Sequence, residues 1–175
     1  MNNFDKCEFF CKKILEEAND DKTKNFAYEK LITINFNQND FKKTKFYADK
    51  ILSQKFINIK TLNEVCLILA KVYFLEKDLE SSVKYLNQIS NENSDDILVQ
   101  VSFLEGSILF LQKKYDLALK KFYHINNKFY KFEKFKNESY LMIAKILLEK
   151  EDFFQAQASV ESIIENVKDE AILDQ

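Results

Sequence analysis

The sequence has no proline, no tryptophan, no arginine and only one glycine among its 175 residues. Strand hairpins and tight turns depend on glycine and proline, so their near absence disfavours sheet architectures. Helices joined by short polar links remain, and a hydrophobic content of 46% is enough for a continuous core in a chain of this length. We therefore expect an all-α fold.

Residues that usually carry catalysis or bind cofactors are also scarce. Gly106 is the only glycine, which excludes a glycine-rich phosphate loop. His124 is the only histidine and has no second imidazole with which to form a metal site or a proton relay, so we expect it to have a packing or surface role. Cys7 and Cys11 share a helix face, but two thiolates do not complete a zinc site, and core packing is the simpler interpretation. The sequence predicts no enzyme, no catalytic residue, no metal and no cofactor.

Signals for export and for membrane insertion are missing as well. The first ten residues carry Asp5 and Glu8 and lack the apolar run of a signal peptide, and the residues before Cys7 do not resemble a lipoprotein cleavage site. No transmembrane segment is seen. Three cysteines, an odd number, suit a reducing compartment better than a disulfide framework. We expect a cytoplasmic protein, and its net charge of −2 gives no global attraction to nucleic acid or anionic lipid.

An internal repeat is present at four polar corners, each of which lies between two segments with helical apolar periodicity. The residue that marks each corner is aromatic or leucine, and successive markers are 38, 36 and 38 residues apart. Residues three, seven and ten positions after each marker form one stripe of a second helix. The residue nine positions before the marker is small in three of the four units. The markers are Phe41, Leu79, Tyr115 and Phe153, and the first-helix positions are Ile32, Ala70, Gly106 and Ala144.

This combination of a small first-helix residue, an aromatic corner and a small residue three positions later resembles the tetratricopeptide repeat family. The clearest instance is the unit of Gly106, Leu109, Tyr115, Ala118 and Phe122. The resemblance covers residues 26–167 and implies a right-handed superhelical solenoid of antiparallel helix hairpins. The chain departs from the family in its longer period, since the family period is about 34 residues, and in having no tryptophan or proline at the ends of the units.

We expect a single repeat domain over residues 1–175. It would begin with half a hairpin at 4–18 and continue through repeats at about 24–53, 61–90, 95–126 and 132–167. A further helix would begin within 168–175, so the chain could also be a structural segment of a larger repeat assembly that associates through its ends. The predicted helices are 4–18, 24–37, 40–53, 61–76, 78–90, 95–112, 114–126, 132–149 and 152–167.

In the family that the chain resembles, first helices line a concave groove that binds peptides of partner proteins. The resemblance therefore implies a protein-interaction adaptor or scaffold with a protein or peptide partner. The simpler interpretation of each aromatic residue at these positions is packing between adjacent helices. The implied groove residues are Phe36, Leu67, Lys71, Phe74, Phe103, Phe110, Leu141 and Lys145, with Thr33, Ser107 and Leu148 beside them.

Charge is distributed unevenly towards the end of the sequence. Residues 113–136 contain eight lysines against Asp116 and Glu133, a local net charge of +6, and aromatic residues are interleaved with them. RNA binding is therefore the alternative function, although a solvated basic face is the simpler interpretation and arginine is absent. Residues 149–175 carry a net charge of −6 from eight acidic residues and two lysines. The two segments could pair within the chain, steer a partner, or join two copies.

Overall fold

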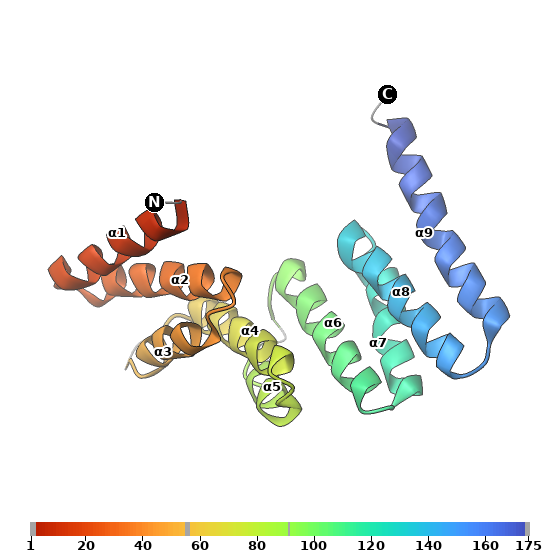
Figure 1. The fold of residues 1–175 in the computed structure, drawn as a ribbon, viewed down its shortest axis with the longest axis horizontal. Coiled ribbons are helices and arrows are strands. Elements are labelled where there is room, and N and C mark those ends of the chain that lie inside the picture. The colour runs from red at the N-terminus through yellow and green to blue at the C-terminus, as the bar shows by residue number, and fades with distance from the viewer. Residues whose placement is uncertain (1–2, 55–56, 91, 174–175) are drawn as a thin grey trace. The chain divides into compact units, whose positions relative to one another are not determined.

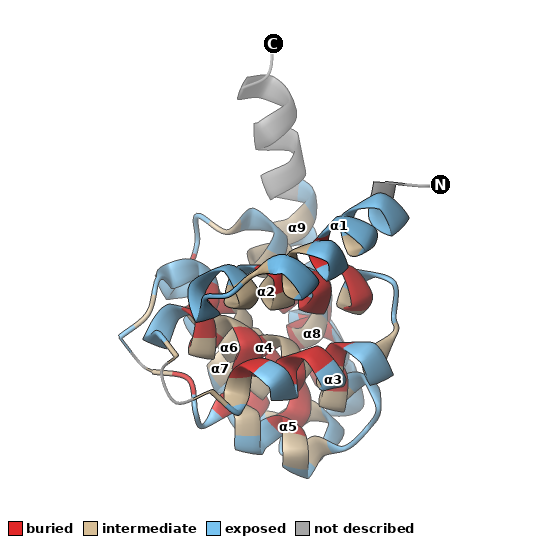
Figure 2. Cartoon of the chain, turned by 90° about the vertical axis from the view of Figure 1, so that its left-hand side faces the viewer, coloured by how far each residue is buried: buried red, intermediate tan, exposed pale blue. Residues whose placement is uncertain are grey.

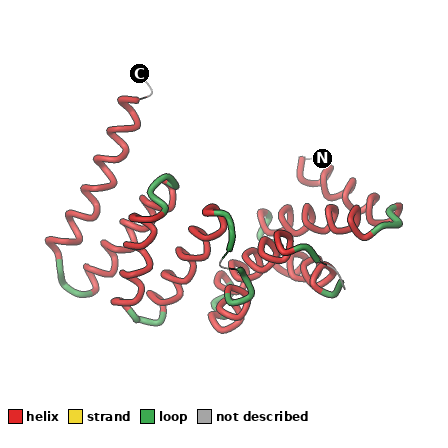
Figure 3. Tube along the Cα trace, turned by 180° about the vertical axis from the view of Figure 1, so that it is seen from behind, coloured by secondary structure: helices red, strands yellow, loops and turns green. Residues whose placement is uncertain are grey.

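The computed structural model describes residues 3–54, 57–90 and 92–173, with side chains from residue 4 to residue 164 within those ranges. Its regular elements there are nine α-helices, and these residues include no strand (Figure 3). The prediction of an all-α fold is confirmed. The helices form two compact units, Met1–Ser90 and Asn91–Gln175, which are described separately below.

The first unit holds five helices (Figure 1). Each helix packs against the preceding one, and α2 also packs against α4, so the first helices of two successive hairpins are neighbours. Helix α1 packs on α2. The helices are α1 (Asn3–Glu17), α2 (Asp21–Asn37), α3 (Phe41–Leu52), α4 (Ile59–Leu75) and α5 (Leu79–Leu86).

The second unit repeats this arrangement with two hairpins. Helix α6 (Asp95–Leu111) pairs with α7 (Tyr115–Lys128), and α8 (Glu133–Glu149) pairs with α9 (Phe153–Leu173). The first helices α6 and α8 again contact each other, and α7 packs on α8. In both units, buried residues lie between helices and exposed residues cover the outer faces (Figure 2). The core of the second unit is centred on Val99, Ala118, Phe122, Ile125, Phe129, Ile143, Ile146, Leu147 and Ala156.

The four corners share one backbone geometry. The residue two positions before each marker has a positive φ, and its N–H and the next N–H close the last turn of the first helix. At the second corner, the N–H of Lys77 donates to the carbonyl of Phe74 at 3.0 Å and the N–H of Asp78 donates to that of Tyr73 at 2.9 Å. This is the Schellman motif, which usually has glycine at the positive-φ position. Here that position holds Asn39 (58°), Lys77 (66°), Lys113 (57°) and Glu151 (61°).

The second helix then begins at an aspartate in three of the four corners. Asp40, Asp78 and Asp152 each accept a hydrogen bond from the backbone N–H three residues later, at 3.0, 3.0 and 3.2 Å. The N–H of Lys43 thereby holds the pKa of Asp40 below its ordinary value. The third corner has Lys114 at this position and makes no such bond. The repeat found in the sequence is therefore also a repeat of backbone geometry, with the same spacing.

Two helix ends differ from the prediction by more than about three residues. Helix α5 ends at Leu86 and not at residue 90, because the N–H groups of Gln88 and Ile89 bond to carbonyls three residues back. Helix α9 continues to Leu173, so the prediction that a separate helix begins at 168 is wrong as far as the backbone is described. No glycine or proline interrupts α9. Residues 174 and 175 lie outside the described residues.

Close helix packing explains the small residue in the first helix. A Cβ on Gly106 would lie 2.9 Å from Cε1 and Cζ of Phe122, whose ring is fully buried. Glycine therefore lets this ring pack directly against the backbone of α6. In the same register the other hairpins also combine large and small residues, so Ile32 is accommodated opposite a small partner. These pairs are Ile32 with Ala48, Ala70 with Leu86, and Ala144 with Val160.

Candidate partner-binding surface

Four of the predicted groove residues lie in the first unit, on the neighbouring helices α2 and α4. Leu67 is only 5% exposed and belongs to the core, so it presents little surface to a ligand. Phe36 is half-buried, with its ring 6.4 Å from that of Phe41. Lys71 and Phe74 are partly exposed. This part of the predicted groove is therefore mostly interhelical packing.

The other four predicted residues lie in the second unit. Phe103 packs edge-on against Phe122 with a centroid distance of 5.6 Å, and Phe110 packs against the core. Leu141 and Lys145 are exposed one turn apart on α8. Only these two present an open surface. The eight predicted residues thus form two groups of four, one in each unit.

A cleft that the sequence analysis missed lies between the first half of α2 and the beginning of α4. It has a volume of about 810 Å³. Phe26 lies in it with 53% of its surface exposed, and the Nζ of Lys30 lies 5.1 Å above its ring. Phe26 comes seven residues before Thr33, on the same stripe of α2, so extending the predicted stripe by two turns would have found it. The remaining lining residues are Asp21, Lys22, Asn25, Glu29, Ile57, Asn58, Lys60, Thr61 and Glu64.

Polar groups with defined partners surround this cleft. The hydroxyl of Thr61 donates to Oε1 of Glu29 at 2.5 Å, which joins α4 to α2. The side chain of Asn58 accepts from the N–H of Thr61 at 2.8 Å and caps α4. In contrast, Oδ1 of Asn25 is buried without a hydrogen-bond partner. The cleft therefore combines an exposed aromatic ring, charges of both signs and one unused hydrogen-bond acceptor.

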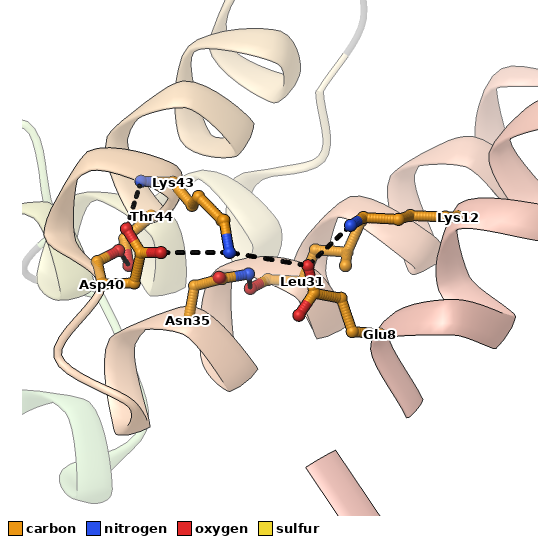
Figure 4. A network of polar contacts seen from close by, with 7 residues as sticks. All are labelled: Glu8, Lys12, Leu31, Asn35, Asp40, Lys43 and Thr44. Atoms are coloured by element: carbon orange, nitrogen blue, oxygen red, sulfur yellow. Dashed lines mark hydrogen bonds and ion pairs between the residues drawn. The ribbon is translucent and has the colours of Figure 1, made fainter. Parts of the chain in front are cut away.

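A second polar network lies where α1, α2 and α3 meet, and its role is structural (Figure 4). Glu8 of α1 lies 2.8 Å from Nζ of Lys12 and 3.8 Å from Nζ of Lys43. Lys43 also bonds to Asp40, and these two carboxylates raise its pKa. The amide nitrogen of Asn35 donates to a backbone carbonyl one turn earlier in α2 at 2.7 Å. Of these contacts, the one between Glu8 and Lys43 joins α1 to the first complete hairpin.

None of the residues considered for metal binding lines the α2–α4 cleft. Cys7 is exposed and Cys11 is buried, and burial raises the pKa of Cys11 first, with the Cys7 thiol adding to it. Burial raises the pKa of Cys66 to about 11. His124 is exposed and packs edge-on against Phe129 at 5.7 Å. Among the described side chains, no three His, Cys, Asp or Glu residues are placed to hold a metal ion.

The basic and acidic segments meet in an ion pair in which the acidic segment supplies the lysine and the basic segment supplies the aspartate. Lys150, from the acidic segment, lies 2.6 Å from Asp116 of the basic segment and joins α8 to α7. This contact and the charge of Lys150 hold the pKa of Asp116 below its ordinary value. Lys121 pairs with Glu105 of α6 at 2.6 Å. The remaining lysines of α7 are considered below.

No protein-family model and no curated protein matches the chain. The described helices include none that is both long enough and apolar enough to cross a membrane. The tetratricopeptide resemblance therefore stays a prediction, which the repeated corners and hairpins agree with at the level of a helical repeat.

Proposed function

We propose that the chain is a non-enzymatic protein-interaction module that holds a segment of a partner protein against the first helices α2 and α4. The cleft beside Phe26 supports this proposal most directly. A large aromatic side chain left half-exposed within a polar rim is the composition typical of a binding hot spot. The argument rests on this surface, because a helical repeat by itself does not define a function.

The proposal includes a tetratricopeptide-like arrangement, in which the two units are consecutive parts of one right-handed superhelical solenoid. The same Schellman corner and the same contact between successive first helices occur in both units, which supports this view. Cys7, Cys11 and Cys66 are free thiols, which fits a reducing compartment such as the cytoplasm.

Binding would combine an apolar anchor with directed hydrogen bonds. An aliphatic or aromatic side chain of the partner would cover the Phe26 ring, and burying such a side chain contributes roughly 1.5–3 kcal/mol. A backbone N–H of the partner would donate to Oδ1 of Asn25 once that side chain turns towards the peptide, because this oxygen is buried and has no partner in the free chain. The charges of Lys22, Lys60 and Glu64 at the cleft would favour one orientation of the peptide.

Site-specific photocrosslinking tests the proposal. A benzoylphenylalanine in place of Phe26 should crosslink to a discrete segment of one host protein when the tagged chain is expressed in its own cells. Phe46 on α3 is a closely matched control, because it is 54% exposed and has Lys50 5.2 Å above its ring, just as Phe26 is 53% exposed with Lys30 at 5.1 Å. Equal crosslinking from both positions, or none from position 26, would contradict a binding site in this cleft.

A pair of alanine substitutions measures how much the Phe26 side chain contributes to the binding free energy. With the crosslinked segment made as a peptide, Phe26→Ala should weaken its binding about 10-fold, which corresponds to roughly 1.4 kcal/mol. Phe46→Ala should leave the affinity unchanged within about twofold. Calorimetric titration measures both, and circular dichroism confirms that each variant stays folded.

A further inference from the structure

The segment that runs from the corner before α7, through α7, to the first turn of α8 is basic and largely unneutralised. Six lysines here make no ion pair with any described side chain, whereas Lys121 is taken by Glu105. Asp116, an acidic residue of the same segment, is already paired with Lys150. Exposed tyrosines accompany the lysines, since Tyr123 is 41% exposed and Tyr130 is 56% exposed. The six lysines are Lys113, Lys114, Lys120, Lys128, Lys131 and Lys134.

A small uncharged cleft lies between α7 and α9, with Tyr140 of α8 also lining it. Its volume of about 200 Å³ suits one flat ring system more than a folded ligand. The lining residues include two tyrosines, an amide and two hydroxyls, and no carboxylate is among them. They are Tyr123, Tyr140, Gln155, Ala158, Ser159 and Ser162.

The two serine hydroxyls of this cleft have their hydrogen-bond donors already in use. Ser159 donates to the backbone carbonyl of Gln155 at 2.9 Å, and Ser162 donates to that of Ala158 at 3.0 Å. The two serine oxygens can still accept hydrogen bonds. A ribose 2′-OH can donate to such an acceptor, and a deoxyribose has no hydroxyl at that position. The side-chain amide of Asn126, one turn beyond Tyr123, is also buried without a partner.

We propose that this face of the second unit binds single-stranded RNA, with one base against Tyr123 and Tyr140 and the phosphates along the lysines. Lys120 precedes Tyr123 by nearly one turn and Lys128 follows it, and the helical rise puts their backbones about 12 Å apart. Helix α7 thus carries one cation before Tyr123 and one after it along its axis. Aromatic rings that stack bases between cations that neutralise phosphates are the usual means of binding single strands without sequence preference.

The same chemistry argues against other polyanions. An acidic peptide would pair with the lysines but would have no use for an uncharged cleft lined by tyrosines. A bilayer would require large aliphatic side chains at this point, and the cleft presents hydroxyls and an amide instead. This surface belongs to the second unit and shares no residue with the α2–α4 cleft of the first, so the inference does not depend on the proposed peptide site.

Fluorescence anisotropy with the full chain tests the inference, using a labelled unstructured RNA of about 12 nucleotides and the DNA of the same sequence, over a range of salt concentrations. RNA should bind more tightly than DNA. Tyr123→Ala should weaken RNA binding about 10-fold, and Tyr123→Phe, which keeps the ring, should restore it. The double change Lys120→Gln and Lys128→Gln should reduce the slope of log affinity against log salt by about 1.4, or about 0.7 for each lost phosphate contact.

A charge-matched control is available on α3 of the first unit. Lys42 and Lys50 are also eight residues apart and exposed, and Lys50 lies over a ring as Lys128 does. Changing both to glutamine should leave RNA binding as it was. The inference is overturned if this control matches the α7 double variant, if Tyr123→Ala binds RNA normally, or if DNA binds as tightly as RNA. Displacement of the RNA by polyglutamate at equal charge concentration would also overturn it, in favour of an acidic protein partner.

Discussion

Replacing Gly106 with alanine tests the close packing of α6 against α7. Alanine is favoured over glycine inside a helix by about 1 kcal/mol, so helix propensity alone predicts stabilisation. The new Cβ, however, would lie 2.9 Å from the Phe122 ring and 3.3 Å from Cβ of Lys121. The ring is fully buried and held edge-on by Phe103, so it has little room to move. Overpacking typically costs about 1–3 kcal/mol, and we expect a net destabilisation of the second unit by about 1 kcal/mol.

A double-mutant cycle separates this clash from other effects. Phe122→Leu alone should destabilise the unit because it leaves a void. When it is combined with Gly106→Ala, the new methyl group fills part of that void, so the double variant should be more stable than additivity predicts by about 1 kcal/mol. Hydrogen exchange resolved to peptides of α6 and α7 is the suitable assay, because the two compact units need not unfold together. Additivity within about 0.5 kcal/mol, or stabilisation by Gly106→Ala alone, would refute the packing argument.

Three further changes probe the corners, the core and the thiols. Lys77→Gly should raise stability by about 0.5–1 kcal/mol in urea titrations, because glycine adopts the positive φ without a Cβ clash, and a loss of stability would contradict this. Ser139→Ala should stabilise the chain by about 1 kcal/mol, because the buried hydroxyl of Ser139 has no hydrogen-bond partner. Ser82→Ala should not stabilise it, because this change removes a 2.8 Å hydrogen bond to a backbone carbonyl of α4. Equal gains in melting temperature for the two variants would disprove the distinction. At about pH 8 a chromogenic disulfide reagent should label the exposed thiol of Cys7 in the native chain. Cys66, with its pKa of about 11, should be labelled only after unfolding. Fast labelling that persists in Cys7→Ser would exclude this assignment.

Helix order and corner spacing could be predicted because apolar periodicity and polar corners are local signals. The corner geometry could not, since Lys77, Lys113 and Glu151 adopt a conformation for which sequence reasoning looks for glycine. The closure of each turn by two backbone hydrogen bonds offsets this strain. The end of α5 was also missed. The residues after Leu86 keep an apolar pattern, but their N–H groups bond to the carbonyl three residues back instead of four.

Which first-helix residues line an open groove was harder to predict from the sequence, for a physical reason. In stacked hairpins a first helix packs against its own second helix, the preceding second helix and the next first helix. Apolar residues on several faces are then needed for the core, and periodicity alone cannot tell an open groove from an interhelical contact. Phe103 and Phe110 therefore pack inward, whereas Leu141 remains exposed. The cleft at Phe26 depends on the first half of α2 and the start of α4 coming together, which is a tertiary property.

One repeat position shows how the fold leaves a side-chain oxygen without a hydrogen-bond partner. Asn63, sixteen residues before its marker, accepts a 3.1 Å hydrogen bond from the N–H of Ser90. That N–H is available because α5 ends at Leu86. Asn25 holds the same position in the preceding hairpin, but the residue equivalent to Ser90 is Leu52, which is still inside α3. The backbone N–H of Leu52 is therefore used within its own helix, and Oδ1 of Asn25 stays unpartnered beside the α2–α4 cleft. A side chain that is hydrogen-bonded in one hairpin is thus left without that partner in another, because the two second helices differ in length.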